Sequence, residues 1–207
     1  MPRDRGLPND EELIERLLKK DEQAYTQIVR AYFGTMQTMA AAIVGNAFAD
    51  EVVQDAWIAV VRALPQFEKR SSLKTWILRI VSNTAKSRLR RESRSIAMGD
   101  LLEDNYSGTD SGRYDERGHW RPDQVPRPWH HDSPDSILSS EELRHQIEQT
   151  LESLPPLQRV AITLRDMEGL DMEEICKILE VSESNARVLL HRGRTKIRLV
   201  IEKHEST

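Results

Sequence analysis

Basic side chains gather in the last predicted helix of the chain, where they could bind nucleic acid. Five of them follow one another with no acidic residue before Glu202: Arg187, Arg192, Arg194, Lys196 and Arg198. Such side chains bind phosphate oxygens, and arginine also reads base edges, so a helix of this kind fits the major groove of DNA. The alternative is an ordinary amphipathic helix whose charged face is solvated.

Residues 170–194 contain the elements that would position these arginines. They read as a helix, a short turn and a second helix, with apolar residues where a helix-turn-helix unit needs contacts: Ile175, Leu179, Val181, Ala186 and Leu189. Ser182 or Ser184 can cap the second helix, because a serine oxygen accepts from otherwise unpaired N–H groups. Cys176 stands where a small residue lets the helices approach, which favours a structural thiol over a redox sensor.

A second segment, residues 67–91, combines an aromatic ring, an amide and several bases. Trp76 and Asn83 are seven residues apart, which places them on one face of a helix. The ring can support or stack on an unpaired base, and the amide can read a base edge. The basic side chains that could hold the DNA backbone are Lys74, Arg79, Lys86, Arg88, Arg90 and Arg91. A plain core position remains the alternative for Trp76.

Charge is distributed unevenly along the 207 residues. The formal net charge of −4 would argue against a nucleic-acid partner if it were uniform. Residues 86–94 hold five bases and one acid, whereas residues 100–135 hold nine acids and four arginines. Local fields of this kind govern binding, so the global sign does not exclude DNA.

Several function classes are disfavoured by composition. The single cysteine excludes an intramolecular disulfide framework and fits a reducing compartment. No apolar run approaches the roughly 18 residues of a membrane span, and the N-terminus lacks a signal-peptide core, so we expect a soluble cytoplasmic protein. We find no phosphate-binding glycine loop, no ligand-spaced Cys/His set and no nucleophile–base pair. We therefore expect no enzyme, no metal site and no cofactor.

The apolar pattern predicts an all-α fold of two small helical domains joined by a flexible acidic linker. A content of 31% charged and 5% aromatic residues suits small helical bundles. The predicted boundaries are residues 10–96 for the first domain, 97–136 for the linker and 137–203 for the second. The linker is rich in Asp, Gly, Pro and Ser. Its Trp120 and Trp129 suggest either local collapse onto a domain or an anchor for a partner.

Local signals place the expected helix ends. In the first domain, helices should break near Asp21, a turn and cap should span Asn46 to Asp50, and Pro65 should end the helix that follows. Ser71 or Ser72 should cap the next helix. In the second domain, the pair Pro155–Pro156 and then Gly169 should each end a helix before the helix-turn-helix unit.

Three segments, taken in order, resemble a known family. They are the acidic helix at residues 50–57, the segment at residues 73–91, and residues 154–159 with the helix-turn-helix that follows them. The family is the extracytoplasmic-function sigma factors, the smallest group of bacterial sigma-70-type initiation factors. The resemblance covers nearly everything outside the linker. It implies an acidic helix that docks on the β′ clamp helices of core RNA polymerase. It also implies a segment that melts and reads the −10 promoter element, and a helix-turn-helix that reads the −35 element.

Residue by residue, the resemblance assigns three groups. The first group, which would contact polymerase, is Glu51, Gln54 and Asp55. The second would read the −10 element, with Asn83 at the flipped-base pocket and Trp76 below it. The −35 contacts fall to Arg187, His191, Arg192 and Arg194. The sequence departs from the family at Glu180, where many members have Gly, and at Val188 and Leu189, which forfeit polar contacts.

The resemblance also implies partners: core RNA polymerase (β′ clamp helices and β), promoter DNA, and an anti-sigma factor, which in many members is membrane-bound. A stress or envelope-signal regulon would follow. The runner-up is a stand-alone helix-turn-helix regulator. That alternative leaves the helix at Asp50 and the basic run from Lys86 to Arg94 without a purpose.

Overall fold

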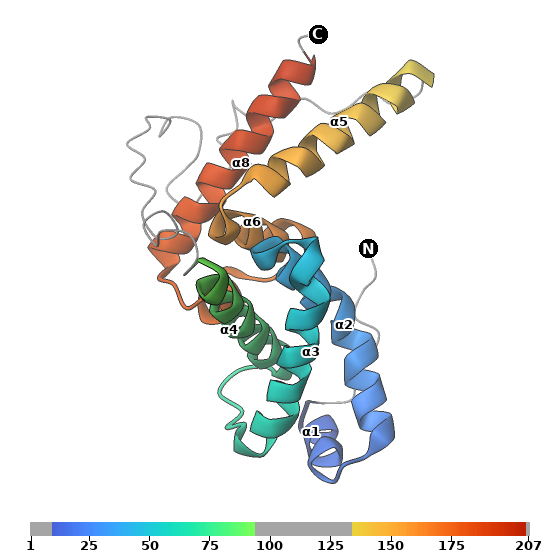
Figure 1. Ribbon diagram of the computed structural model, residues 1–207, viewed down its shortest axis with the longest axis vertical. Coiled ribbons are helices and arrows are strands. Elements are labelled where there is room, and N and C mark those ends of the chain that lie inside the picture. Colours follow the sequence, from blue (N-terminus) through green and yellow to red (C-terminus); the bar gives the residue numbers. More distant parts are fainter. Residues whose placement is uncertain (1–9, 94–133, 206–207) are drawn as a thin grey trace.

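The computed structural model describes residues 10–93 and 134–205, and every element in these two ranges is helical (Figure 1). The predicted all-α fold class is confirmed. None of the helices in the described ranges combines the length and apolar character needed to cross a membrane.

The first helix group consists of α1 (Asp10–Leu18), α2 (Glu22–Val44), α3 (Asn46–Ala63) and α4 (Leu73–Ser93), with a short 3-10 turn, η1 (Leu64–Gln66), after α3. Helix α2 packs against both α3 and α4, and α3 packs against α4. Fully buried side chains from all four helices fill the space between them, among them Leu13, Ile28, Met36, Val53 and Ile77.

Polar caps set the helix starts of this group, as the sequence predicts. The Asp21 carboxylate accepts hydrogen bonds from the backbone N–H groups of Gln23 and Ala24, at 2.8 and 3.2 Å. The Ser72 hydroxyl accepts from the N–H of Thr75 at 3.1 Å, so Ser72 caps the start of α4. Pro65 lies in η1, two residues beyond Ala63, the last residue of α3.

The expected turn from Asn46 to Asp50 is wrong, because α3 already begins at Asn46. Gly45 has φ +82°, a conformation that residues with a Cβ rarely adopt. Its N–H closes α2 by donating to the Ala41 carbonyl at 2.9 Å. The chain thus changes direction at a single residue, and no further turn is needed before the next helix.

The second group consists of α5 (Pro134–Ser153), α6 (Pro156–Ile162), the π-helical turn η3 (Thr163–Met167), α7 (Met172–Leu179) and α8 (Glu183–Glu205). Helix α5 starts at Pro134, which is inside the predicted linker. A proline is well tolerated in the first turn of a helix, so Pro134 does not prevent this start. Pro155–Pro156 separates α5 from α6, and Gly169 with φ +71° follows η3, as predicted. Residues 97–133, with Trp120 and Trp129, lie outside the described ranges.

The two groups contact each other. Helix α2 packs against α6 and η3, and α4 packs against α7, so one apolar core runs through both groups. Helices α5 and α8 extend side by side away from the first group (Figure 1).

Gly193 allows α8 to cross α6 closely. A Cβ at this position would lie 2.3 Å from Cδ1 of Ile162, whereas a Cβ on Gly34 in α2 would meet nothing within 4 Å. Ile162 is itself buried, so its side chain has little room to move.

We expect Gly34→Ala to raise the free energy of unfolding by up to about 1 kcal/mol, through helix propensity alone. Gly193→Ala gains the same propensity but overpacks Ile162, so we expect it to lower that free energy by roughly 1 kcal/mol. Urea denaturation followed by circular dichroism measures both. Equal gains at the two positions would contradict the close α6–α8 crossing.

Candidate nucleic-acid interface

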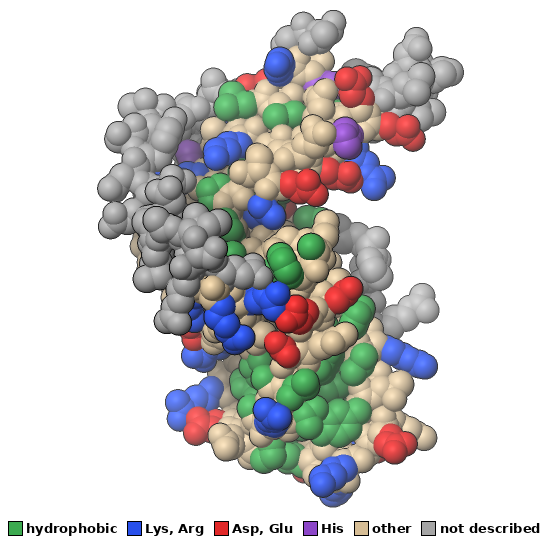
Figure 2. Space-filling view, viewed as in Figure 1, with side chains coloured by type: hydrophobic (Ala, Val, Ile, Leu, Met, Phe, Trp, Pro, Cys, Tyr) green, Lys and Arg blue, Asp and Glu red, His purple; other side chains and the backbone are tan. Residues whose placement is uncertain are grey.

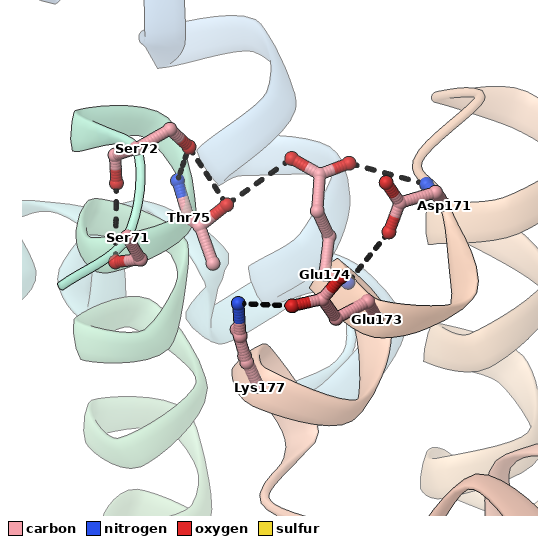
Figure 3. Close-up of polar contacts among 7 residues, drawn as sticks. All are labelled: Ser71, Ser72, Thr75, Asp171, Glu173, Glu174 and Lys177. Atoms are coloured by element: carbon pink, nitrogen blue, oxygen red, sulfur yellow. Dashed lines mark hydrogen bonds and ion pairs between the residues drawn. The ribbon is translucent and has the colours of Figure 1, made fainter.

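Reciprocal hydrogen bonds fix the start of α7, the first helix of the helix-turn-helix unit. The Asp171 carboxylate accepts from the N–H of Glu174 at 2.7 Å, and the Glu174 carboxylate accepts from the N–H of Asp171 at 3.1 Å (Figure 3). This is a capping box, which pairs two N–H groups that a helix start otherwise leaves open.

The turn between α7 and α8 passes through Glu180, which adopts the left-handed conformation with φ +60° and ψ +44°. Ser182 then caps α8 by accepting from the N–H of Asn185 at 3.2 Å. Ile175, Leu179 and Ala186 are fully buried between the two helices. The predicted helix-turn-helix is confirmed, with Ser182 as the cap.

Helix α8 presents the residues predicted to meet the −35 element. Arg187 lies in its first turns and pairs with Glu183 at 2.5 Å, while Val188 beside it is exposed. His191 and Arg192 follow and are half-buried. Sequence analysis overlooked this pair, although Glu183 stands four residues before Arg187, the spacing at which helical side chains meet.

Arg194 is held by another element. Its guanidinium donates to both carboxylate oxygens of Asp166 in η3, at 2.9 and 2.5 Å. A two-pronged pair of this kind fixes the orientation of the guanidinium as well as its position. Arg194 therefore ties α8 to η3, a structural role that the sequence did not predict.

Helix α4 carries the predicted −10 residues. Trp76 is half-buried against Phe67, with ring centroids 4.8 Å apart, so its ring belongs partly to the core. Asn83 is exposed two turns further along. Asn83 thus offers its amide to solvent on the helix face that also carries Trp76, two turns away.

Four of the basic residues of α4 fall into two sets. Arg90 and Arg91 are exposed near its C-terminal end. Two others face the second helix group: Arg79 pairs with Glu180, and Lys86 donates to the Leu179 carbonyl at 2.6 Å. Burial lowers the pKa of the Lys86 ammonium.

Arg88 of α4 joins two surfaces that the sequence assigned to different partners. Its guanidinium pairs with Glu51, a predicted polymerase contact on α3, and lies 4.9 Å from the centre of the Phe48 ring. A cation over an aromatic face is attracted by the ring quadrupole. The predicted docking helix and the predicted −10 helix are thus linked directly.

Gln54 and Asp55 are exposed on α3, as predicted. Sequence analysis missed the apolar side chains next to them: Ile58 and Val61 are 50% and 46% exposed. These positions follow Gln54 by four and seven residues, so they share its face. Together with Val29 and Phe33 of α2 they form what we call the apolar patch, in the region where Figure 2 shows hydrophobic side chains gathered over α2 and α3.

Cys176 is half-buried in α7, and burial raises the pKa of its thiol. A protonated thiol is a poor nucleophile, which agrees with a packing role for this residue.

Comparison with known proteins identifies the family. The family described as Sigma-70 region 2 matches residues 28–95, and Sigma-70, region 4 matches residues 144–197. The chain is 31% identical over 188 residues to the ECF RNA polymerase sigma-E factor of Escherichia coli, covering 91% of this chain and 92% of that protein. It is 30% identical to the Haemophilus influenzae protein of the same name, with coverages of 91% and 93%.

Solved structures show the same fold. CnrH, in complex with the cytosolic domain of CnrY, superposes with a TM-score of 0.58 at 19% identity, covering 94% of this chain and 97% of that one. The sigma factor RpoE of Bartonella quintana, in complex with the anti-sigma factor NepR, gives a TM-score of 0.57 at 18% identity, with coverages of 86% and 96%.

The chain belongs to the extracytoplasmic-function group of the sigma-70 family. It is an RNA polymerase sigma factor that directs the initiation of transcription.

Proposed function

We propose that different segments of this sigma factor bind different partners. Residues 10–96 dock on core RNA polymerase and read and melt the −10 element, residues 97–136 tether the two parts, and residues 137–203 read the −35 element. The chain has no catalytic residues of its own, because the polymerase supplies the nucleotide chemistry, and it acts in the cytoplasm. One observation supports this division most. The exposed amide of Asn83 lies on the basic helix α4, which packs directly against the acidic helix α3.

The proposed polymerase-docking surface combines charge with apolar area. Asp55 and Gln54 are exposed on the face of α3 that also carries Ile58 and Val61. Exposed aliphatic side chains rimmed by polar residues are typical of protein–protein interfaces. This surface would meet the β′ clamp helices.

Asp55→Arg should lower the affinity for core polymerase at least tenfold, since reversing a charge at an interface costs more than about 1.4 kcal/mol. The double variant Gln54→Ala/Asp55→Ala and the single variant Ile58→Ser should each weaken polymerase binding less severely than Asp55→Arg. Because all three side chains are exposed, helicity should not change. A pull-down with purified core enzyme measures the loss, with Glu141→Arg on α5 as the matched charge reversal. Undiminished binding of the Asp55 variants would place the docking surface elsewhere.

The proposed −10 contact is Asn83, supported by Trp76. An unpaired base can be captured only after the strands separate, so the amide would act late in initiation. The half-buried ring of Trp76 would form the firm wall against which such a base stacks. Arg90 and Arg91, exposed about two turns beyond Asn83, would hold phosphates nearby.

Asn83→Ala should reduce open-complex formation about tenfold while changing closed-complex binding less than twofold, because its contact forms only with melted DNA. Permanganate reactivity of the melted bases reports the first quantity, and a gel shift at low temperature reports the second. A matched loss in both assays would assign Asn83 a structural role instead.

The proposed −35 reader is the N-terminal half of α8. Arg187 lies where a recognition helix usually reaches base edges, and its partner Glu183 is on the same exposed helix surface. Arg194 lies two turns further along and is oriented by Asp166. An arginine held in this way suits contact with a phosphate at the edge of the groove.

Arg187→Ala should relax sequence preference at one −35 position by about 1–3 kcal/mol. Arg194→Ala should weaken all sequences alike and reduce the salt slope by about one. Holoenzyme binding to promoters with a randomised −35 element separates the two effects. Asp166→Ala is the control, since it removes the Arg194 pair but keeps the arginine. The same uniform loss in both arginine variants would refute this assignment.

We also propose that an anti-sigma factor regulates the chain. Two structural neighbours are described as complexes with CnrY and with the anti-sigma factor NepR. The apolar patch would give such an inhibitor a surface to cover in competition with polymerase. A stand-alone regulator, by contrast, would have no use for the polar and apolar face of α3.

A further inference from the structure

The outward face of α8 carries an apolar side chain in the part of the helix that is proposed to meet DNA. Val188 lies in the second turn of α8 and is 43% exposed. Single apolar side chains on a protein surface are common, so exposure alone gives Val188 no role. What distinguishes Val188 is its position relative to the buried and the basic residues of the same helix.

The buried side of α8 is defined by four residues in its first three turns. They are Ala186, Leu189, Leu190 and Gly193, all of which are buried. At about 100° per residue, Val188 lies about 150° around the helix axis from the middle of this stripe. Val188 therefore points away from the side on which α8 packs against the rest of its group.

Basic residues flank Val188 on both sides. By the same count around the axis, Arg187 lies about 100° to one side of Val188, and Arg192 lies about 40° to the other. Arg194 is close to Arg187 in this projection, so it extends the first flank along the helix. A helix that is held in a groove through both flanks presents the residue between them to the floor of the groove, where the base edges lie.

The stability of α8 does not explain a valine at this position. A β-branched side chain loses rotamer freedom in a helix, so valine is a poorer helix former than most alternatives. Because Val188 is exposed, it also contributes little to the core that its buried neighbours join. Neither helix propensity nor core packing accounts for Val188.

The floor of the major groove offers one kind of apolar group. This is the C5-methyl group of thymine, whereas the other base-edge groups donate or accept hydrogen bonds. A valine cannot pair with those groups, and it would leave them unsatisfied when water is displaced from the contact. Contact with a methyl group instead removes apolar surface of both partners from water. Thymine is therefore the base that an apolar side chain selects here.

We propose that Val188 is a specificity-determining residue that contacts the C5-methyl group of one thymine in the −35 element. This rests on the proposed role of α8 as the −35 reader. Arg187 would read a different base edge through hydrogen bonds. The −35 preference of this chain would then combine a polar contact with an apolar one, and the valine that forfeits hydrogen bonds would supply a selectivity of its own.

The first test locates the thymine. Holoenzyme binding to promoters with a randomised −35 element should show that the wild type prefers thymine at one position where Val188→Ala has no preference. Alanine is a better helix former than valine, so this loss cannot come from a destabilised α8. Leu199→Ala is the matched control, because it removes another exposed aliphatic side chain three turns further along α8. It should leave the thymine preference unchanged.

The second test removes the methyl group from the DNA. Uracil in place of that thymine lacks only the C5-methyl group and still pairs with adenine. This replacement should lower the affinity of wild-type holoenzyme about three- to fivefold, the equivalent of one buried methyl group. With Val188→Ala the same replacement should cost less than about 1.5-fold, because the two changes remove one shared contact.

Two results would overturn the contact. One is a uracil effect of the same size in the wild type and in Val188→Ala, and the other is a thymine preference that Val188→Ala leaves intact. Failure of the proposed −35 role would look different, since wild-type holoenzyme would then show no preference anywhere in the randomised element. Failure of the valine contact alone would leave in place the preference that Arg187→Ala relaxes.

Discussion

Helix α4 must satisfy two sets of neighbours at once, and the arrangement of the chain depends on how its surface is divided between them. Leu73, Ile77 and Val81 are completely buried on the side that packs against α2 and α3. The polar side that remains is shared between α7 and solvent, and solvent receives Asn83. Because the same helix is the proposed −10 reader, its pairing with α7 sets where the second helix group lies relative to that reader.

A second connection runs from α4 to the proposed docking helix. Arg88 reaches Glu51 and the ring of Phe48, so α3 and α4 share an ion pair as well as an apolar contact. The acidic surface of α3 and the basic surface of α4 are therefore physically adjacent.

Local chemistry made much of this fold predictable. Asp21, Ser72 and Ser182 cap helices because each side chain acts on N–H groups two or three residues ahead, a distance that sequence analysis can follow. Contacts between distant residues could not be inferred in this way. Glu180 meets Arg79 across 101 residues, and Asp166 meets Arg194 across 28. The exposure of Ile58 and Val61 was likewise hidden, because their spacing on an amphipathic helix fits a core equally well. The predicted start of α3 was wrong, because Gly45 alone makes the turn that was expected to span Asn46 to Asp50.

The central claim is that this single chain reads promoters in two places while bound to polymerase, and transcription from a complex template tests it most directly. Purified core RNA polymerase, with and without the chain, would transcribe sheared genomic DNA from the source organism, and the 5′ ends of the transcripts would be sequenced. The account predicts new start sites that depend on the chain and share two upstream motifs at a fixed separation. Start sites that are the same without the chain, or that share only a single motif, would contradict it.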